Sequence, residues 1–193
     1  MIDAENIVVI VLAAGLSRRY PEGDKLLRLL NHKPLAEYSA DTLGAIPFME
    51  RFAVVPTGKE LLARLFQQHD FLLVNNSSPE RGLGYSLSLG VERVLKSRQP
   101  EAIMVCLADM PFISDEVVSR LVEGLNSGAS AAVCAYEDQI SPPAVFRKTH
   151  FCSMARLDGD RGARKLLGQI SDVCEVEIDP RLMKDFDTSD DFT

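Results

Sequence analysis

Residues 8–25 read VVIVLAAGLSRRYPEGDK, and this stretch decides the fold. An apolar run ends at residues 13–15, Ala-Ala-Gly, and is followed by the cations Arg18, Arg19 and Lys25. The pattern predicts a buried strand that leads into a loop of small residues. Small residues let backbone N–H groups approach an anion, and the Arg and Lys side chains neutralise oxygens that N–H groups alone leave charged. We therefore expect the loop to bind a polyanion, and a nucleoside triphosphate fits it best.

Neither of the common phosphate-binding loops matches this stretch. A P-loop has four residues between its first glycine and a Gly-Lys-Ser/Thr sequence. Here seven residues separate Gly15 from Gly23, which is followed by Asp24 and Lys25. A dinucleotide-binding fingerprint needs two further glycines soon after Gly15, and the sequence has none there. The loop is therefore expected to be of another type.

The composition is that of one acidic globular domain. The chain has 193 residues, of which 46% are hydrophobic, enough for a sizeable core but short for two full domains. Its formal net charge of −7 disfavours a general nucleic-acid-binding protein, because affinity for the phosphate backbone comes mainly from an excess of Lys and Arg. A cation cluster is more informative in such an acidic chain, although Arg28 and Lys33 also fit a solvated helix face.

The four cysteines do not form a metal-binding pattern. Cys106, Cys134, Cys152 and Cys174 are far apart, no Cys-x-x-Cys pair occurs, and the chain has three histidines. This argues against a zinc site and favours reduced, mostly buried thiols. The apolar segment at residues 7–14 is too short to span a bilayer. It lies before the basic residues, whereas the apolar region of a signal peptide lies after them. We expect a cytoplasmic protein without a membrane or nucleic-acid partner.

Strand-length apolar runs alternate with segments of helical periodicity along the chain. Strands are predicted at residues 7–12, 52–55, 71–74, 102–107, 131–135 and 173–178, and helices at residues 34–43, 59–68, 83–95 and 115–125. Because parallel strands need crossover helices, this alternation predicts an α/β fold with a mostly parallel, Rossmann-like sheet and helices on both faces. Ligands of such sheets bind at the carboxyl ends of the strands. The site is therefore expected in the loops at residues 13–23, 56–58, 75–84 and 108–111.

Asp109 comes two residues after the predicted strand at residues 102–107. A carboxylate at the tip of a central parallel strand contributes little to packing and is well placed to hold a divalent cation above the sheet. The alternative is that Asp109 caps the next helix, but Ser114 already occupies the capping position. We therefore expect Asp109 to be a metal ligand.

Two other polar segments have simple structural explanations on the sequence alone. The acidic residues 185–191, which include Asp187, are typical of a solvated tail. Residues 75–78 and 81–86, Asn-Asn-Ser-Ser and Arg-Gly-Leu-Gly-Tyr-Ser, suit a base or a sugar held by backbone and amide groups. A plain turn followed by a helix N-cap explains this region almost as well.

Together these segments resemble the molybdenum cofactor cytidylyltransferase family, whose fold also serves sugar-nucleotide and methylerythritol-phosphate nucleotidyltransferases. The resemblance extends from residue 8 to residue 191. It rests on LAAGLSRR at 12–19 with KLL at 25–27, GLGYSLS at 82–88, LADMP at 107–111, PPAVF at 142–146, GDRGAR at 159–164 and DFDT at 185–188. Each segment is weak alone, but in this order and with the predicted strands between them they are specific for the superfamily.

The resemblance implies a single NTP-transferase domain over residues 1–193. It implies nucleotide contacts from Leu12, Ala13, Ala14, Gly15, Arg19, Lys25, Ser86 and Asp109, catalytic roles for Arg19, Lys25 and Asp109, and Mg²⁺ held by Asp109 and Asp187. Asp187 thereby changes from a tail charge to an expected metal ligand. Tyr20-Pro21 replaces the family's Met-Gly, and Lys25 lies one residue further from Arg19 than the family's lysine does from its arginine. The GDRGAR segment, which also fits a capped helix start, separates this branch from relatives with other substrates.

The implied reaction is the transfer of CMP from CTP to molybdopterin that carries molybdenum. Its products are molybdopterin cytosine dinucleotide and pyrophosphate, and a recipient molybdenum enzyme would be a transient partner. CTP is implied because guanylyl-transferring relatives typically have Leu-Ala-Gly-Gly where residues 12–15 of this chain read Leu-Ala-Ala-Gly. Two alternatives stay open. One is an NAD(P)-dependent oxidoreductase, against which the missing dinucleotide-binding turn argues, and the other is a non-catalytic carrier of the molybdenum cofactor.

Overall fold

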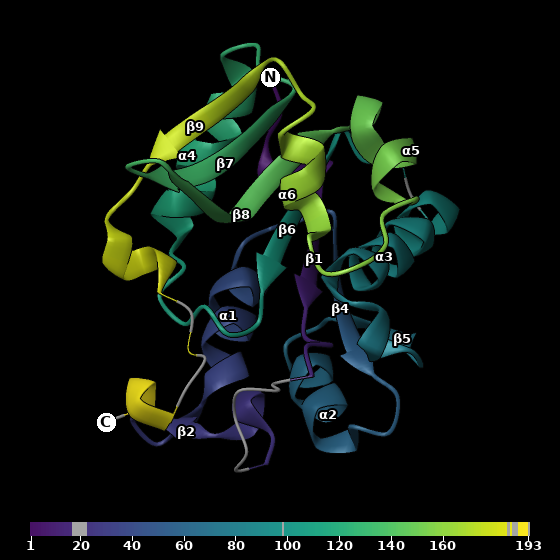
Figure 1. Cartoon of the computed structure of the whole chain (residues 1–193), viewed down its shortest axis with the longest axis vertical. Coiled ribbons are helices and arrows are strands. Elements are labelled where there is room, and N and C mark those ends of the chain that lie inside the picture. Colours follow the sequence, from purple (N-terminus) through teal and green to yellow (C-terminus); the bar gives the residue numbers. More distant parts are fainter. Residues whose placement is uncertain (17–22, 98, 185, 187–188, 193) are drawn as a thin grey trace.

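The computed structural model describes residues 1–16, 23–97, 99–184, 186 and 189–192. Its centre is a seven-stranded sheet with the strand order β5-β4-β1-β6-β8-β7-β9 (Figure 1). The strands are β1 (Ile7–Leu12), β4 (Glu50–Pro56), β5 (Leu72–Asn76), β6 (Ala102–Leu107), β7 (Ala131–Tyr136), β8 (Gln139–Arg147) and β9 (Val173–Glu177). A separate two-stranded antiparallel ribbon consists of β2 (Leu29–Leu30) and β3 (Lys33–Pro34).

The sheet is mostly parallel, as the alternation of strands and helices predicts. β1 pairs in parallel with β4 and β6, β4 pairs in parallel with β5, and β7 pairs in parallel with β9. β8 is antiparallel to both of its neighbours, β6 and β7. The helices are α1 (Leu35–Ala45), α2 (Glu60–Gln68), α3 (Leu83–Ser97), α4 (Asp115–Asn126), α5 (Phe151–Met154) and α6 (Gly162–Leu167).

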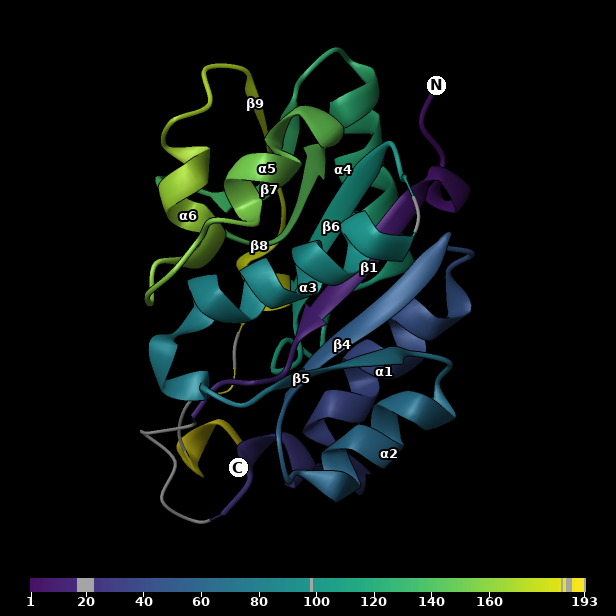
Figure 2. The same ribbon diagram turned by 90° about the vertical axis from the view of Figure 1, so that its right-hand side faces the viewer.

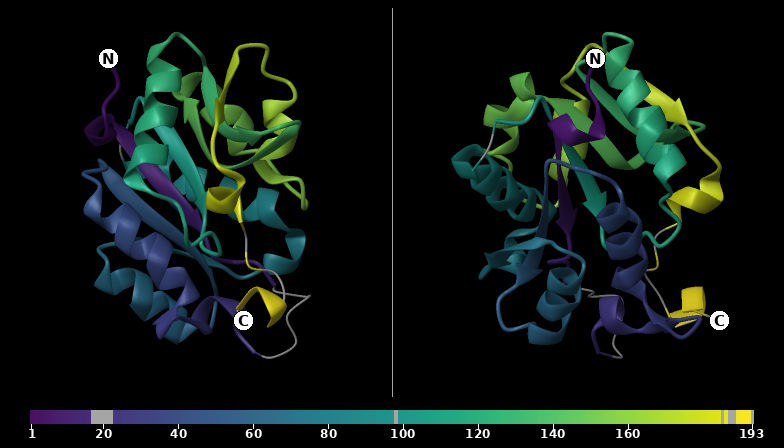
Figure 3. Two further views of the ribbon diagram at one scale, coloured as in Figure 1. Left: turned by 90° about the vertical axis from the view of Figure 1, so that its left-hand side faces the viewer. Right: turned by 180° about the vertical axis from the view of Figure 1, so that it is seen from behind.

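β1 is buried along its whole length because both faces of the sheet are covered. Ile7, Val9 and Val11 lie in the cluster that contains the apolar residues of α1, α2 and α4. Val8 and Ile10 lie in the opposite cluster, with α3, α5 and α6. Figure 2 shows α3 crossing one face of the sheet, and the rear view in Figure 3 shows α1 and α4 on the other. A strand buried on both faces needs a continuous apolar run, which explains why this stretch decides the fold.

The predicted bounds of β1 and β6 are confirmed, and the four predicted helices end within two residues of the observed ones. The prediction omits β8, α5 and α6. In β8, Val133 pairs with Ala144 and Cys134 pairs with Ser141, so Pro142 and Pro143 lie in a bulge. Proline cannot donate to a sheet ladder, and two adjacent prolines therefore hide a strand from pattern analysis. α5 and α6 span four and six residues, too few for helical periodicity to be visible.

The four cysteines are free thiols. Cys106 and Cys134 are buried, and burial raises the pKa of the Cys134 thiol to about 12. Cys174 is half-buried and Cys152 is exposed. Two of the four thiols are therefore fully buried, fewer than the sequence pattern suggests. None of the helices in the described part of the chain is both long enough and apolar enough to cross a membrane.

Candidate active site

A pocket of about 470 Å³ opens at the carboxyl ends of β1 and β6, and we call it the β1–β6 pocket. It is lined by Leu12, Ala13, Ala14, Gly15, Leu16, Lys25, Leu26, Pro79, Glu80, Gly82, Leu83, Ser86, Leu107, Asp109 and Asp160. All seven of the sequence-predicted nucleotide contacts that the structure describes are in this wall. Arg19 and Asp187 lie outside the described residues.

Three of the four expected loops contribute to the pocket. The loop at residues 56–58 does not, so this part of the prediction is wrong. The backbone N–H of Thr57 bonds to the carbonyl of Asn76 at 2.9 Å, which ties that loop to the outer strand β5. In its place Asp160 enters the wall from the GDRGAR segment.

Lys25 and Asp109 form an ion pair in the wall of the pocket. The Lys25 Nζ lies 2.7 Å from the Asp109 Oδ2, and the two side chains are 7% and 20% exposed. Asp109 is held at the strand tip because the N–H of Ala108 bonds to the carbonyl of Leu12 at 3.1 Å, which extends the β1–β6 pairing. On the other side, Asp24 accepts a hydrogen bond from the N–H of Leu26 at 3.2 Å. Backbone contacts therefore fix both partners.

The structure confirms that Asp109 does not cap the next helix. Ser114 is the N-cap of α4, and its Oγ accepts a hydrogen bond from the N–H of Val117 at 3.4 Å. The Asp109 carboxylate does not cap α4. It faces the pocket beside the buried ammonium group of Lys25.

The charge of the described pocket wall is acidic. Glu80, Asp109 and Asp160 are acidic, and Lys25 is the one cation among the lining residues that the structure describes. A triphosphate would be repelled by three carboxylates unless further cations came with it. The wall therefore suits a phosphate ligand that is accompanied by a divalent cation.

Ser86 lines the pocket, but its hydroxyl group is already engaged. Ser86 Oγ donates to the carbonyl of Gly82 at 3.2 Å and accepts from Asn76 Nδ2 at 3.0 Å. The Asn76 Oδ1 accepts from the N–H of Ser78 at 2.8 Å, and Asn76 is wholly buried. The Asn76 amide thus shapes the loop, which agrees with the alternative of a plain turn for this residue.

The C-terminal segment returns to Asp109. The N–H of Phe186 donates to the carbonyl of Asp109 at 3.3 Å, and Phe186 is 2% exposed. Its ring packs against Phe112 and Phe192, with centroid distances of 5.8 and 5.3 Å. The segment is therefore anchored at Phe186, the residue before Asp187, which a solvated tail would not be.

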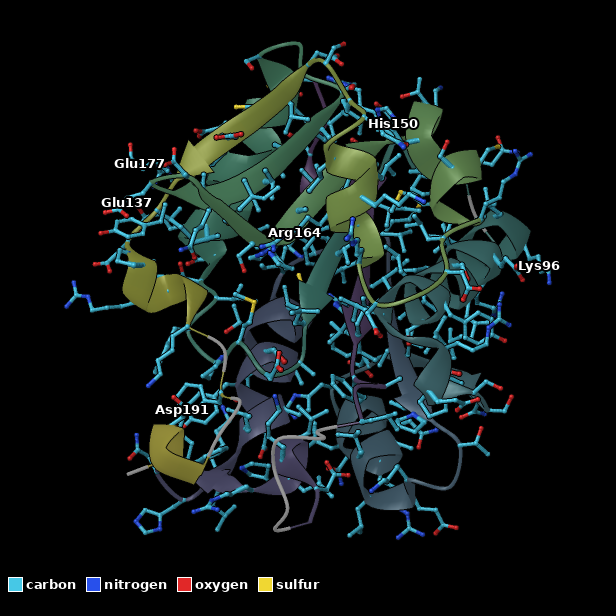
Figure 4. The ribbon with its side chains drawn as sticks, in the orientation of Figure 1. Lys96, Glu137, His150, Arg164, Glu177 and Asp191 are labelled. Carbon is cyan, nitrogen blue, oxygen red and sulfur yellow. The ribbon has the colours of Figure 1, made fainter. Side chains whose placement is uncertain are left out.

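A second pocket, of about 650 Å³, adjoins the first, and we call it the β8–α6 pocket. The two pockets share Leu12, Leu83, Leu107 and Asp160 as lining residues. The second is lined by apolar side chains of the sheet and by the cations Arg161, Arg164 and Lys165. Figure 4 shows Arg164 extending from α6 over β8, where its Nη2 donates to the carbonyl of Ile140 at 2.8 Å. Sequence analysis singled out the GDRGAR segment but gave it no place in a site.

One group of three close metal-ligand side chains occurs within the described ranges, away from both pockets. It consists of Glu37, Asp41 and His69, and His69 Nδ1 lies 3.1 Å from Asp41 Oδ1. Lys33 also pairs with Asp41. Ion pairing between these side chains accounts for the cluster.

The fold and the pocket at the strand ends define an α/β protein with a candidate ligand site at the carboxyl ends of its parallel strands. The sequence model of the protein family described as the MobA-like NTP transferase domain matches residues 9–173, and the chain belongs to this family. It is 30% identical to the purine catabolism protein PucB of Bacillus subtilis, over 96% of this chain and 94% of that protein. It is 29% identical to a probable molybdenum cofactor guanylyltransferase of Pyrococcus horikoshii, over 66% of this chain and 60% of that protein.

Solved structures agree with this assignment. A homologue of the Mycobacterium tuberculosis protein Rv0371c, from Mycobacterium sp. strain JC1, has a TM-score of 0.82 and 27% identity. That match covers 98% of this chain and 94% of the homologue. The Mycobacterium tuberculosis Rv0371c protein solved in complex with manganese has a TM-score of 0.76 and 25% identity, over 96% of this chain and 95% of that one. Nucleotidyl transfer is the activity that the family membership supports.

Proposed function

We propose that this chain transfers CMP from CTP to the phosphate of molybdopterin that carries molybdenum, and that it does so with Mg²⁺. The observation that carries the proposal is the contact between Lys25 and Asp109 at the carboxyl ends of β1 and β6. An ammonium group and a carboxylate in one phosphate-sized pocket are suited to positioning a nucleotide and its metal.

The reaction needs positioning and charge neutralisation more than a protein nucleophile. A phosphate oxygen of the acceptor attacks the α-phosphorus of CTP and forms a new phosphoanhydride bond. The bond between the α-phosphorus and the bridging oxygen breaks, and its electron pair leaves with pyrophosphate. Because the acceptor phosphate is already ionised at neutral pH, no general base has to remove a proton. Lys25 and Arg19 stabilise the charge that develops on the pyrophosphate.

The described residues fit a hard divalent cation. Asp109 offers a carboxylate to the pocket, and the acidic wall disfavours a triphosphate without accompanying cations. Asp109 and Asp187 would hold Mg²⁺, which supplies charge neutralisation at the phosphate oxygens when it is bound. The placement of Phe186 against Asp109 supports the pairing of these two carboxylates.

The β8–α6 pocket is the site that we assign to the acceptor. It adjoins the β1–β6 pocket, so an acceptor phosphate there can reach the α-phosphate of a nucleotide in the first pocket. Its apolar wall suits a flat heterocycle, and Arg161 and Arg164 suit a phosphate. An acidic protein with a local cluster of cations in one pocket selects a small anion more readily than a nucleic acid.

The preference for CTP over GTP rests on Ala14. Ala14 lines the β1–β6 pocket, is 2% exposed and belongs to the apolar cluster under α3. A methyl group at this position fills space that a glycine would leave open, and a purine needs that space more than a pyrimidine does. Single-group discrimination of this kind contributes about 1–3 kcal/mol, or roughly tenfold to two-hundredfold in kcat/KM.

A pyrophosphate-release assay with each nucleotide and molybdopterin tests the proposal. We expect turnover with CTP, Mg²⁺ and acceptor together, none in excess chelator, and a higher kcat/KM for CTP than for GTP. Equal values for the two nucleotides would refute the cytidylyl assignment and leave the nucleotidyl transfer. Binding of the acceptor without pyrophosphate release from any nucleotide would favour a carrier, and oxidation of NADPH would favour the oxidoreductase.

A further inference from the structure

We propose that residues 158–162 form a wall between the two pockets that couples their occupancy, so that nucleotide and acceptor bind cooperatively. The inference rests on the proposed function, because it takes the β1–β6 pocket as the nucleotide site and the β8–α6 pocket as the acceptor site. Residues 82–86 border the first pocket, and α6 borders the second. The wall lies against residues 82–86 and leads directly into α6.

Two glycines, one just before α3 and one in its first turn, allow the wall to approach the backbone of residues 82–86. The N–H of Gly84 donates to the carbonyl of Gly159 at 2.7 Å. A Cβ at Gly84 would lie 2.9 Å from the carbonyl oxygens of Asp158 and Gly159, and a Cβ at Gly82 would lie 2.4 Å from Asp160 Oδ1. Gly82 has a φ of +94°, which also favours glycine. Any side chain at either position would push the wall away from the loop.

A side-chain contact closes the outer edge of the same interface. Arg81 Nη2 donates to Asp158 Oδ2 at 3.1 Å, and the guanidinium carbon lies 3.7 Å from the centroid of the Tyr85 ring. The hydrogen bond between Arg81 and Asp158 raises the pKa of the guanidinium group and lowers the pKa of the carboxyl group. Both side chains are about half exposed, so the pair contributes less than the backbone contact does.

The wall is continuous with the cations of the acceptor pocket. Gly162 is the first residue of α6, and a Cβ there would lie 3.0 Å from Leu83 Cδ2. Arg164 follows two residues later, and Asp160 lines both pockets. A shift of residues 158–160 therefore changes the position of the groups that would hold the acceptor phosphate.

Coupling follows from the order that each ligand imposes on the wall. A nucleotide that orders residues 82–86 also holds Gly84 against Gly159, so that less conformational freedom remains to be lost when the acceptor binds. Linkage requires the reverse as well: a bound acceptor tightens nucleotide binding by the same factor. Typical coupling factors lie at about 5-fold to 150-fold.

Hydrogen exchange with CTP and Mg²⁺ as the probe tests the coupling without the acceptor. In the wild-type protein we expect slower exchange at residues 82–86 and also, by at least about fivefold, at residues 158–164. Gly84→Ala inserts a methyl group into the interface while favouring the helix. Because the N–H of residue 84 is the donor to Gly159, the variant should keep the first protection at the Ser86 N–H, which bonds within the loop, and lose the second. Gly44→Ala is the matched control, because a Cβ at this helical glycine meets its nearest atom, the carbonyl oxygen of His69, at an ordinary 3.5 Å.

The outcomes separate the two proposals. Protection of residues 82–86 without protection of residues 158–164 in the wild-type protein overturns the coupling and leaves the nucleotide site intact. Full protection of both segments in Gly84→Ala also overturns it. No protection at residues 82–86 contradicts the nucleotide site itself, and the coupling falls with it. If Gly84→Ala does not fold, Arg81→Ala serves instead, with a smaller but measurable loss at residues 158–164.

Discussion

The two halves of the sheet build their pockets in different ways. In the parallel half, β5-β4-β1-β6, the pocket lies at the strand tips and is formed by loops that connect strands to helices. In the mixed half, β8-β7-β9, the pocket lies over the face of the sheet beneath α6, on side chains such as Val133 and Ala144. Loops at strand tips present backbone groups and charges that any nucleotide can use. Side chains on a sheet face set the shape that one acceptor needs, so the second half is where substrate choice among relatives would change.

The largest expected effect is the loss of catalysis in the parallel half. Asp109→Asn keeps the shape and a hydrogen-bond acceptor for Lys25 but removes the charge that a divalent cation needs. We expect kcat/KM to fall by about a thousandfold or more, with an unchanged circular dichroism spectrum. Asp138→Asn, in the exposed β7–β8 turn, is the control. Wild-type rates for Asp109→Asn would remove the metal assignment.

A smaller effect, confined to the acceptor, is expected in the mixed half. Arg164→Ala should raise the KM for the acceptor by about tenfold to a hundredfold, because a charge-assisted hydrogen bond is lost. The dissociation constant for CTP, measured by calorimetry, should stay within the error of the wild-type value. Lys96→Ala, at the exposed end of α3 (Figure 4), is the control. A change in CTP binding equal to the change in acceptor KM would show that the two pockets do not divide the substrates.

The C-terminal segment belongs with the parallel half if Asp187 is a metal ligand. Asp187→Asn should raise the Mg²⁺ concentration needed for half-maximal activity by at least about tenfold. The dissociation constant of the nucleotide should rise by a smaller factor. Substitution is a better test than truncation, because deleting the segment also removes the buried Phe186. Asp191→Asn, whose carboxylate pairs with Lys184 at 3.3 Å, controls for tail charge. Identical Mg²⁺ titrations for Asp187→Asn and the wild-type protein would exclude the ligand.

The smallest effect concerns base choice. Ala14→Gly should lower the ratio of kcat/KM for CTP and GTP by up to about tenfold without inverting it, since other groups near Ser86 also border the base. Ala53→Gly is the matched control, because Ala53 is a buried strand alanine of β4 that lines neither pocket. An unchanged ratio in Ala14→Gly would assign the preference to another part of the loop.

The same division explains how much the sequence could predict. In the parallel half, the apolar runs of β1 and β6 and the Ser114 cap have strong local signals, and Asp109 follows from its place after a strand. In the mixed half, the two prolines of β8 remove the strand signal, and α6 is too short for a periodic pattern. The shared wall arises from contacts between residues 82–84 and 158–160, which no local pattern can reveal. Likewise, the hydrogen bond from the Asn76 amide to Ser86 forms only in a fold that places β5 beside α3.

β1 is synthesised long before both of the strands that flank it. β4 begins at Glu50 and β6 at Ala102, whereas β7 and β8 are joined by a two-residue turn and can pair as soon as they are made. A nascent chain that has not yet reached β6 therefore carries an apolar strand with an unpaired edge, and such an edge can pair with another chain. The strand that defines the fold is thus also the segment that exposes unfinished copies of this protein to pairing with other chains, because β4 covers one edge of β1 and leaves the other open until β6 is made.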